Sequence, residues 1–342
     1  MAQERINWIF SSFKNVCVSV SGGKDSTVLF ELTWRIAQEL GREVNVFFLD
    51  QEAEYKATIG IVRGIMNRPG VVAHWYQCPY KMTNATSYNE PYLYAWEPGK
   101  QWIRDKEPGT IHDNNSGVDR FYPFMEWFEG QWGADTAMLI GLRSEESLNR
   151  YGAVTRNPGY EGVKWSSKSK GKSIKFYPLY DWAFEDIWTY LGTEKVPYNK
   201  VYDWMWVKGF NIPEMRVSNL IHERAFKSLA QLQEFEPETY ERLLRRLDGV
   251  HAAALYAKEQ EVYSAKKLPP NFKKWKDYRD FLLQTLPVDT QPFRDRFASQ
   301  KQTEPIYKQQ VRQLLLNDWE NNIPVIQQTN REDPKKKWME LL

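Results

Sequence analysis

The N-terminal part of the chain alternates between stretches with the apolar period of a strand and stretches with that of a helix. In residues 15–20 valines occupy every second position, with Cys17 and Ser19 between them, and this predicts a short buried strand. Residues 25–40 carry apolar side chains at helical spacing, and Gly41 follows as a helix C-cap. A strand that leads directly into a helix is therefore the first predicted unit.

The same alternation continues along the chain. Strands are predicted at 44–50 and 71–77, with a helix at 55–66 between them. This order is typical of an α/β fold with an open, mostly parallel sheet and helices on both faces. From Cys78 to about residue 120 the pattern dissolves, and the length and aromatic content of this segment indicate a functional lid.

The second half of the chain first repeats the α/β pattern and then becomes helical. A helix is predicted over 121–132, a strand that runs into a helix over 135–150, and a strand at about 174–178. Beyond about residue 200 the apolar spacing is mostly helical. We therefore predict an α/β domain over 1–200 and a mainly helical domain over 201–342.

A phosphate-binding turn is predicted where the first strand meets the first helix. Two glycines let the backbone approach an anion closely, and the N–H groups of a helix N-terminus favour negative charge. An ordinary glycine turn is the less favoured alternative. The residues that we expect to hold phosphate are Ser21, Gly22, Gly23, Lys24, Asp25, Ser26 and Thr27.

This turn differs from a Walker A loop, whose pattern is G-x-x-x-x-G-K-[ST]. That pattern needs glycine at position 18 and serine or threonine at position 25, where the chain has Val18 and Asp25. A carboxylate beside a polyphosphate repels it unless a cation lies between them. Asp25 therefore predicts a bound Mg²⁺ ion.

The loop and several later segments resemble a known superfamily. "SGGKDST" is similar to the pyrophosphate loop of the PP-loop ATP pyrophosphatases, which share an adenine nucleotide alpha-hydrolase-like fold. "FFLDQEAEY", "LIGLRSEESLNR" and "YPLYDWAFEDIWTYL" resemble its phosphoadenosine phosphosulfate (PAPS) reductase-like group. "NATSYNEPYLYAW" and "MRVSNLI" resemble the immunoglobulin-binding regulator A-type branch, described as co-activators of prophage genes. The resemblance covers about residues 14–255 and implies bound ATP or PAPS.

Asp50 ends the second predicted strand, beside the loop at the sheet edge. In the resembled group this strand end borders the nucleoside. The resemblance therefore implies that Asp50 holds Mg²⁺ or a ribose hydroxyl, with Glu52 as a weaker candidate. The alternative is that Asp50 caps the helix that begins near Glu54.

The segment "GLRSEESLNR" supplies the second group of candidates. Glu146 and Arg150 are four residues apart and share a helix face, where a solvated ion pair is the alternative to a binding role. Because a strand is predicted to end at Gly141, Arg143 and Arg150 are expected to point into the same crevice as the loop lysine and to bind anionic oxygens. We count Gly141, Arg143 and Glu146 among the nucleotide-binding candidates, and Arg156 as a weaker extension.

Other basic, acidic and aromatic positions have a structural interpretation that is at least as good as a functional one. A solvated loop is favoured for the lysine-rich segment and for the tail "DPKKKW", with contact to an anionic ligand or to nucleic-acid phosphates as the alternative. Asp181 is expected to cap the helix "FEDIWTYL", and Trp182 to pack. The lysine-rich segment contains Lys164, Lys168, Lys170, Lys172 and Lys175. Four tryptophans could either stack on a planar ligand or pack in a core, namely Trp96, Trp102, Trp127 and Trp132.

Composition narrows the functional classes. A net charge of +2 argues against nucleic acid as the main partner. No apolar run reaches transmembrane length and no signal peptide is present, and this predicts a cytoplasmic protein without a membrane partner.

The two cysteines, Cys17 and Cys78, cannot supply the ligands of an iron–sulfur cluster. Sulfonucleotide reductases of the resembled group use a cysteine near the C-terminus, at about the position of Arg216, and this chain has none after Cys78. Reduction is therefore disfavoured.

Three functions remain. In the favoured one, ATP binds with Mg²⁺ and a substrate nucleophile attacks the α-phosphorus, while Lys24 and the loop hold the leaving pyrophosphate and Arg143 and Arg150 offset charge. The resemblance also implies a nucleotide-gated regulator that acts through a protein partner, often a ParB-like protein, with the helical part as the docking surface. The third hypothesis is nucleic-acid modification.

Overall fold

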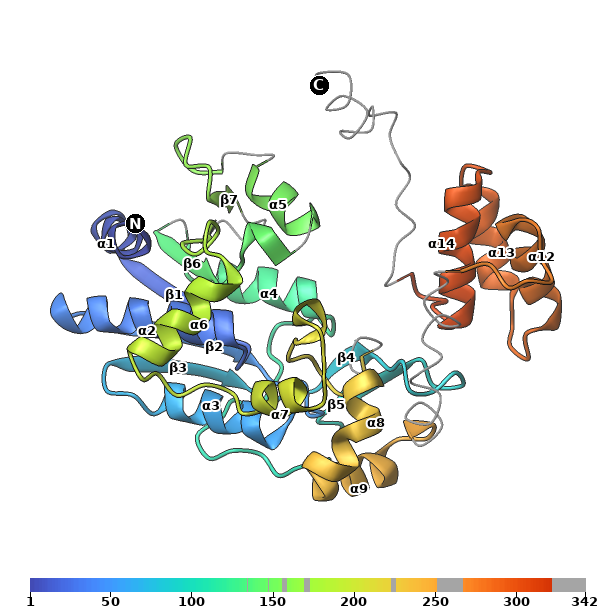
Figure 1. Ribbon diagram of the computed structural model, residues 1–342, viewed down its shortest axis with the longest axis horizontal. Helices are drawn as coiled ribbons and strands as arrows, with labels where there is room; N and C mark the ends of the chain where they lie inside the picture. The colour runs from blue at the N-terminus through green and yellow to red at the C-terminus, as the bar shows by residue number, and fades with distance from the viewer. Residues whose placement is uncertain are drawn as a thin grey trace.

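The computed structural model of the protein is built around a six-stranded sheet flanked by helices (Figure 1). It describes residues 1–133, 135–146, 148–155, 159–168, 173–222, 226–250 and 267–321. The strand order is β3-β2-β1-β6-β8-β7, with every neighbouring pair parallel except β7 and β8. The strands are β1 (Asn15–Ser19), β2 (Val44–Leu49), β3 (Val71–Tyr76), β6 (Thr136–Ile140), β7 (Ser166–Lys168) and β8 (Ile174–Phe176).

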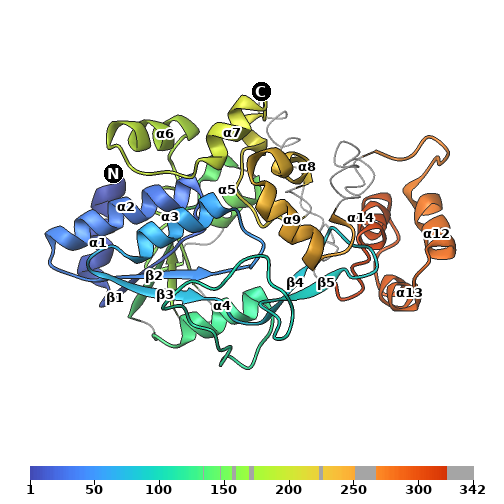
Figure 2. The same ribbon diagram turned by 90° about the horizontal axis from the view of Figure 1, so that it is seen from below.

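Helices cover both faces of this sheet, so the predicted open, mostly parallel α/β sheet is confirmed. In Figure 2, α2 and α3 lie over one face and α4 lies over the other. The helices of the α/β part are α1 (Ala2–Ser12), α2 (Lys24–Glu39), α3 (Lys56–Met66), α4 (Phe121–Gly130), α5 (Leu148–Thr155) and α6 (Phe184–Thr193), with a 3₁₀ turn at Ser144–Glu146.

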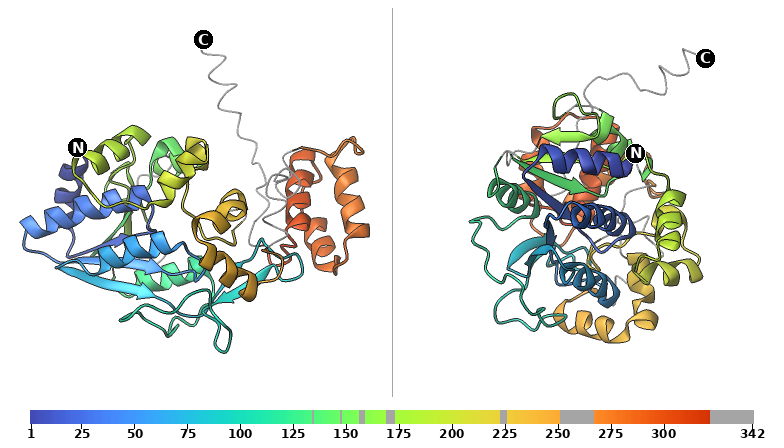
Figure 3. Two further views of the ribbon diagram at one scale, coloured as in Figure 1. Left: turned by 60° about the horizontal axis from the view of Figure 1, so that its bottom comes forward. Right: turned by 90° about the vertical axis from the view of Figure 1, so that its left-hand side faces the viewer.

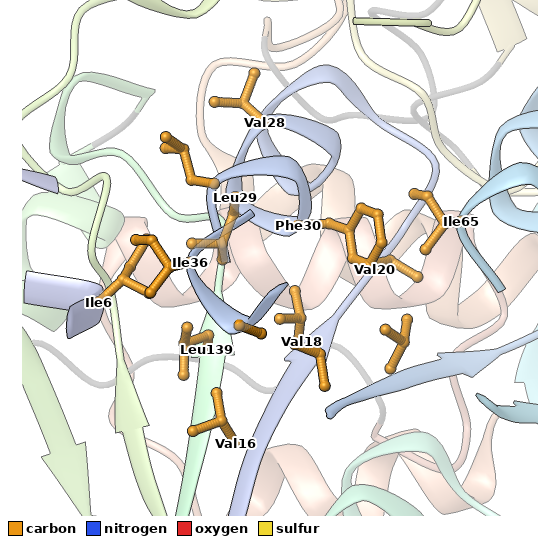
Figure 4. Packing of buried hydrophobic residues seen from close by; sticks show 14 of the residues in the cluster. Ile6, Val16, Val18, Val20, Val28, Leu29, Phe30, Ile36, Ile65 and Leu139 are labelled. Carbon is orange, nitrogen blue, oxygen red and sulfur yellow. The ribbon is translucent and has the colours of Figure 1, made fainter. Parts of the chain in front are cut away.

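The alternation in β1 separates two buried clusters. Its valines, Val16 and Val18, pack with Leu29 of α2 and Leu139 of β6, as Figure 4 shows. Cys17 faces the opposite side, in the cluster that contains Phe124 and Phe128 of α4. Burial on both faces is what a covered parallel sheet requires, and it explains the apolar run from which the strand was predicted.

The structure contains elements that were not predicted from the sequence, among them β7, which lies in the lysine-rich segment that was expected to be a solvated loop. Residues 2–12 form α1, which packs against α2, although no element was predicted there. The segment after Cys78 contains an antiparallel hairpin of β4 (Tyr80–Thr83) and β5 (Tyr92–Ala95). Strands this short repeat the two-residue period too few times to stand out in an aromatic segment.

The chain beyond residue 200 is helical, as predicted, but its helices pack in two places. The first three, α7 (Val201–Val207), α8 (Phe226–Phe235) and α9 (Pro237–Arg246), share a buried cluster with Ala53 and Tyr55 of the α/β part. The last three, α12 (Trp275–Thr285), α13 (Gln291–Ala298) and α14 (Glu304–Leu315), form a cluster of their own at the far end of the molecule (Figure 3). The division at residue 200 stays a prediction. Among the described residues, no helix is both long and apolar enough to cross a membrane.

Two glycines allow the turn after β1 to lie against its neighbours. Gly22 has φ +67°, and a Cβ at this position would come within 2.7 Å of Thr58 Cγ2 on α3. A Cβ on Gly141 would lie 2.9 Å from the backbone of Asp25. Asn199 holds the turn from the other side, since its Nδ2 donates to the Gly22 carbonyl at 3.1 Å and to Thr58 Oγ1 at 2.9 Å. The turn therefore has little room to change shape.

A buried acidic network closes the end of β2. Asp50 is fully buried and accepts hydrogen bonds from Trp75 Nε1 and Gln77 Nε2, both at 2.9 Å, and from Arg104. Glu52, at φ +62°, accepts from the Trp96 backbone N–H at 2.7 Å and pairs with Arg246. Tyr55 is the N-cap of α3, so the expectation that Asp50 caps this helix is wrong; the Asp50 oxygens accept hydrogen bonds within the network instead. The binding of Mg²⁺ or of a ribose hydroxyl by Asp50 stays a prediction.

Glu54 is the third acid of this segment, and its carboxyl group is close to that of Asp50. Burial and, to a smaller extent, the Asp50 carboxylate raise the pKa of Glu54 to about 8, against the opposing effects of Arg104 and of a hydrogen bond with Asn219. The folded protein therefore keeps the Glu54 proton at pH values at which the unfolded chain has released it.

Replacing Gly22 by alanine should destabilise the fold more than replacing Gly41. Both glycines have positive φ, so each variant carries the cost of about 1 kcal/mol for a left-handed residue. Only at Gly22 does the added methyl group meet a neighbour, since Gly41 has open space, and overpacking costs about 1–3 kcal/mol more. Urea unfolding followed by circular dichroism measures the difference. Equal losses in the two variants would contradict the close packing of the turn.

Replacing Glu54 by glutamine should flatten the pH dependence of stability. Because the pKa is about 8 in the folded protein and 4.5 as the ordinary value, the free energy of unfolding falls as the pH rises between these values. The neutral amide removes this contribution. Urea midpoints measured at about pH 5 and about pH 8 should therefore differ less in Glu54→Gln than in the wild type. Glu39→Gln, at an exposed position, is the control, and parallel profiles for all three proteins would contradict the expectation.

Candidate functional site

A cleft lies at the carboxyl ends of β1 and β6, where an open parallel sheet binds its ligands. Its volume is about 340 Å³, within the range of small-molecule sites. Its walls are formed by the turn after β1, the first turn of α2, the segment after β6, the start of α6, helix α7 and the segment at 212–218. The polar residues that line it are Ser21, Lys24, Asp25, Ser26, Arg143, Glu145, Glu146, Arg150, Tyr202, Arg216 and Ser218.

An ion triad made of Lys24, Asp25 and Arg143 lies on the floor of this cleft. Lys24 Nζ is 2.9 Å from one Asp25 oxygen, and Arg143 Nε is 2.5 Å from the other. Burial alone would raise the pKa of Asp25, but the charges of Lys24 and Arg143 and their hydrogen bonds lower it below its ordinary value. Asp25 is therefore a carboxylate that keeps two cations in place beside the N-terminus of α2.

A second ionic group continues from the triad along the cleft wall. Arg143 Nη1 donates to Glu145 at 2.9 Å, and Glu146 pairs with Arg150, four residues further on. Arg216 donates to the Glu146 carbonyl at 3.2 Å. Together with Lys24 these arginines give the cleft one more cation than carboxylates. The cleft can therefore hold an anion with several oxygens.

Tyr202, on α7, reaches the cleft from far along the chain. Its hydroxyl accepts the Lys24 backbone N–H at 3.2 Å, and the Lys24 ammonium lies 5.4 Å from the centre of its ring. Burial raises the pKa of Tyr202 above its usual value, so the hydroxyl keeps its proton and can donate it to a ligand. Sequence reasoning missed Tyr202, and it noticed Arg216 only as the replacement for a cysteine, because neither belongs to a local phosphate-binding pattern.

The structure brings together most of the predicted site residues but not all. The predicted residues that line the cleft are Ser21, Gly23, Lys24, Asp25, Ser26, Gly141, Arg143, Glu146 and Arg150. Gly22 packs against α3 instead, and Thr27 is buried with its hydroxyl on the Gly23 carbonyl. The Ser26 hydroxyl also donates to that carbonyl and accepts the Ser21 N–H, so these side chains shape the turn itself.

Several weaker candidates have structural roles. The four tryptophans pack in or against the cluster under α4 and do not line the cleft. Asp181 was wrongly expected to cap α6: it pairs with Arg5 at 2.6 Å, and Asp186 makes the capping contact with the Ala183 N–H. Lys175 pairs with Glu129 at 3.0 Å. Arg156, Lys170, Lys172 and the tail "DPKKKW" lie outside the described residues.

The acids of the cleft do not form a dedicated metal site. Within the described part of the chain, no group of three or more His, Cys, Asp or Glu side chains is arranged to hold a metal ion. Asp25, from which a bound Mg²⁺ was predicted, is already balanced by Lys24 and Arg143. A single carboxylate fits Mg²⁺ only when phosphate oxygens and water supply the remaining ligands.

Both cysteines are buried away from this cleft. Cys17 lies inside β1, and burial raises the pKa of its thiol far above the usual value. Burial also raises the pKa of Cys78 to about 11, against a smaller opposing effect of a backbone hydrogen bond. Neither thiol is in the thiolate form near neutral pH, so neither is suited to nucleophilic attack.

Comparison with known proteins identifies two regions in the chain. Residues 15–211 match the profile of the phosphoadenosine phosphosulfate reductase domain, and residues 209–330 match a domain of unknown function, DUF3440. The first region contains the loop, the arginines that follow β6, and Tyr202.

Known proteins are similar to most of this chain or to a part of it. The uncharacterized protein YbdN of Escherichia coli is 30% identical over 316 residues, which is 87% of this chain and 77% of that protein. Adenosine 5'-phosphosulfate reductase 2 of Bacillus subtilis is 23% identical over 200 residues, 58% of this chain and 72% of that enzyme. A PAPS reductase structure from Candida auris, in a phosphate complex, has a TM-score of 0.36 and 15% identity, and the match covers 59% of this chain and 84% of that one. On the match over residues 15–211, the chain belongs to the phosphoadenosine phosphosulfate reductase domain family.

Proposed function

We propose that the cleft binds an adenine nucleotide, ATP or PAPS, through its phosphates, and that the protein transfers the adenylyl group of ATP to a substrate. The observation that supports this best is the position of the ion triad, with two cations held at the N-terminus of α2 beside a glycine turn. A helix N-terminus and fixed cations favour the same ligand, a phosphate group. The membership of a nucleotide-binding family agrees with it.

In the proposed reaction the nucleophile attacks the α-phosphorus of ATP. A bond forms from the nucleophile to that phosphorus, the bond from the α-phosphorus to the bridging oxygen breaks, and pyrophosphate leaves with the electron pair. Lys24 and the turn hold the leaving group, while Arg143 and Arg150 offset charge on the transferring phosphate. Glu146 Oε1 is buried without a hydrogen-bond partner, 3.9 Å from Arg143 Nε, and we propose it as the acceptor of the nucleophile's proton.

We propose that Mg²⁺ enters with the nucleotide. Asp25 would supply one ligand, and the phosphate oxygens would supply others, as is usual for this ion. When bound, the ion would neutralise the phosphates and assist the departure of pyrophosphate. Reduction of a sulfonucleotide is not part of the proposal, because both thiols are buried with raised pKa values.

A second candidate function is nucleotide-gated binding of a protein partner. The observation that favours it is α7, which places Tyr202 in the cleft and leaves Trp206 and Val207 of the same helix exposed. A shift of α7 on nucleotide binding would therefore alter an exposed apolar surface. The resemblance to prophage co-activators, with a ParB-like partner, points the same way. A pull-down of such a partner that depends on nucleotide and occurs without turnover would favour this candidate.

Incubation with ATP and Mg²⁺ tests the enzymatic proposal. A set of candidate nucleophiles (amines, carboxylates, thiols and phosphates) is offered, and AMP and pyrophosphate are measured by chromatography. Lys24→Met should reduce product formation by about a hundredfold, because a charged donor to the leaving group is lost. Lys14→Met, at an exposed lysine before β1, should leave the rate unchanged. Wild-type protein that binds ATP yet forms no AMP with any nucleophile would contradict adenylation and leave the regulatory candidate.

Tyr202→Phe tests whether the hydroxyl on α7 contributes to nucleotide binding. The variant loses one hydrogen bond to a phosphate oxygen, so the dissociation constant of a non-hydrolysable ATP analogue should rise about three- to tenfold. Tyr198→Phe is the matched control, because the Tyr198 hydroxyl donates to Asp203 and does not line the cleft. Titration calorimetry measures both variants. Tighter binding by Tyr202→Phe would mean instead that the hydroxyl blocks the Lys24 N–H.

A further inference from the structure

A second cleft, of about 370 Å³, lies next to the β4–β5 hairpin and is distinct from the cleft at the carboxyl ends of β1 and β6. The two clefts share no lining residue, although the segment after Met215 borders both, with Ser218 in the first and Asn219 in the second. Half of the residues that line the second cleft are aromatic or apolar, namely Tyr80, Met82, Tyr92, Phe121, Tyr122 and Pro123. The other half are polar, namely Gln51, Lys81, Thr83, Arg120, Asn219 and His222. This mixture is typical of a small-molecule site.

Tyr80 forms the inner wall of this cleft and has an unused hydrogen-bonding group. The residue is fully buried, and its hydroxyl has no hydrogen bond of normal geometry, although the Gln51 side chain lies nearby. Burial, and then the carboxyl groups of Glu54 and Asp50, raise the pKa of Tyr80 well above its usual value. The hydroxyl is therefore a permanent donor. A buried donor without an acceptor costs stability, and such groups call for an explanation such as a ligand.

Two cations mark the other side of the cleft. Lys81 and Arg120 both pair with the carboxylate of Glu320, which follows α14 in the chain. The charged side chains among the residues that line the cleft, Lys81 and Arg120, are both cations. The first turn of α4, with Phe121 and Tyr122, also lines the cleft, and a helix N-terminus favours an anion. The contact with Glu320 demonstrates that an acid group is accepted by these cations.

We propose that the second cleft binds a small aromatic acid. Its carboxylate or phosphate pairs with Lys81 and Arg120, its ring lies against the aromatic walls, and an acceptor atom receives the proton of the Tyr80 hydroxyl. The aromatic walls select the ring, and the two cations select the acid over a neutral analogue. Because Glu320 contacts the same cations, its negative charge weakens the binding of the acid.

Tyr80→Phe tests the site directly, because it removes the buried hydroxyl and nothing else. The probes are 4-hydroxybenzoate and phenyl phosphate, which distinguish a carboxylate from a phosphate, and 4-hydroxybenzamide is the neutral control. Saturation-transfer NMR on the full chain should give millimolar dissociation constants for at least one acid, as expected for about ten heavy atoms. In Tyr80→Phe that constant should rise about five- to tenfold, while the urea midpoint stays equal or increases.

Glu320→Gln tests the charge at the same cations. The neutral amide should tighten binding of the acid severalfold and leave the amide control unaffected. Glu304→Gln is the control, because Glu304 lies in the same group of helices but accepts a hydrogen bond from the Trp275 N–H. It should change the binding of neither the acid nor the amide. The proposal is overturned if neither acid binds, if the neutral amide binds as well as the acid, or if Tyr80→Phe binds normally or unfolds at a lower urea concentration than the wild type. An unchanged or weakened affinity in Glu320→Gln would overturn it too.

Discussion

The ionic contact of the Asp25 carboxylate with Lys24 and Arg143 is the interaction on which the cleft at the carboxyl ends of β1 and β6 depends. Two cations side by side repel each other, and a buried acid between them makes their proximity stable before any ligand arrives. The acid also ties the first turn of α2 to the segment that follows β6, two parts of the chain that the sheet brings together. We propose that a bound polyphosphate takes over these cations from Asp25, which means that the site is prepared in advance for its ligand.

The backbone around this triad has few conformations available to it. Gly22 and Gly141 allow contacts that no side chain would permit, and Asn199 fixes the turn against α3. The same turn receives Tyr202 from α7, so that a helix beyond residue 200 completes a site that begins near residue 20. The helices α7 to α9 share a core with the α/β part, which explains why the site and the start of the helical part form one packed unit.

The features that depend on local periodicity could be predicted from the sequence, and those that depend on distant contacts could not. The valines of β1 and the glycine turn carry their information within a few residues, and so the sheet, α2 and most of the cleft were anticipated. Asp50 ends a strand as an active-site acid would, yet Trp75, Gln77 and Arg104 bury it in a network that only the folded chain assembles. Tyr202 and Tyr80 are ordinary tyrosines in the sequence, and their surroundings give them their roles.

We infer that the cations of the triad exchange the Asp25 carboxylate for phosphate when a nucleotide binds. A structure of the protein soaked with a non-hydrolysable ATP analogue and Mg²⁺ tests it most directly. Phosphate oxygens should lie within hydrogen-bonding distance of Lys24 Nζ and of the Arg143 guanidinium, and at least one of these two side chains should have lost its contact with Asp25. A nucleotide bound elsewhere, with both cations still on Asp25, would contradict it.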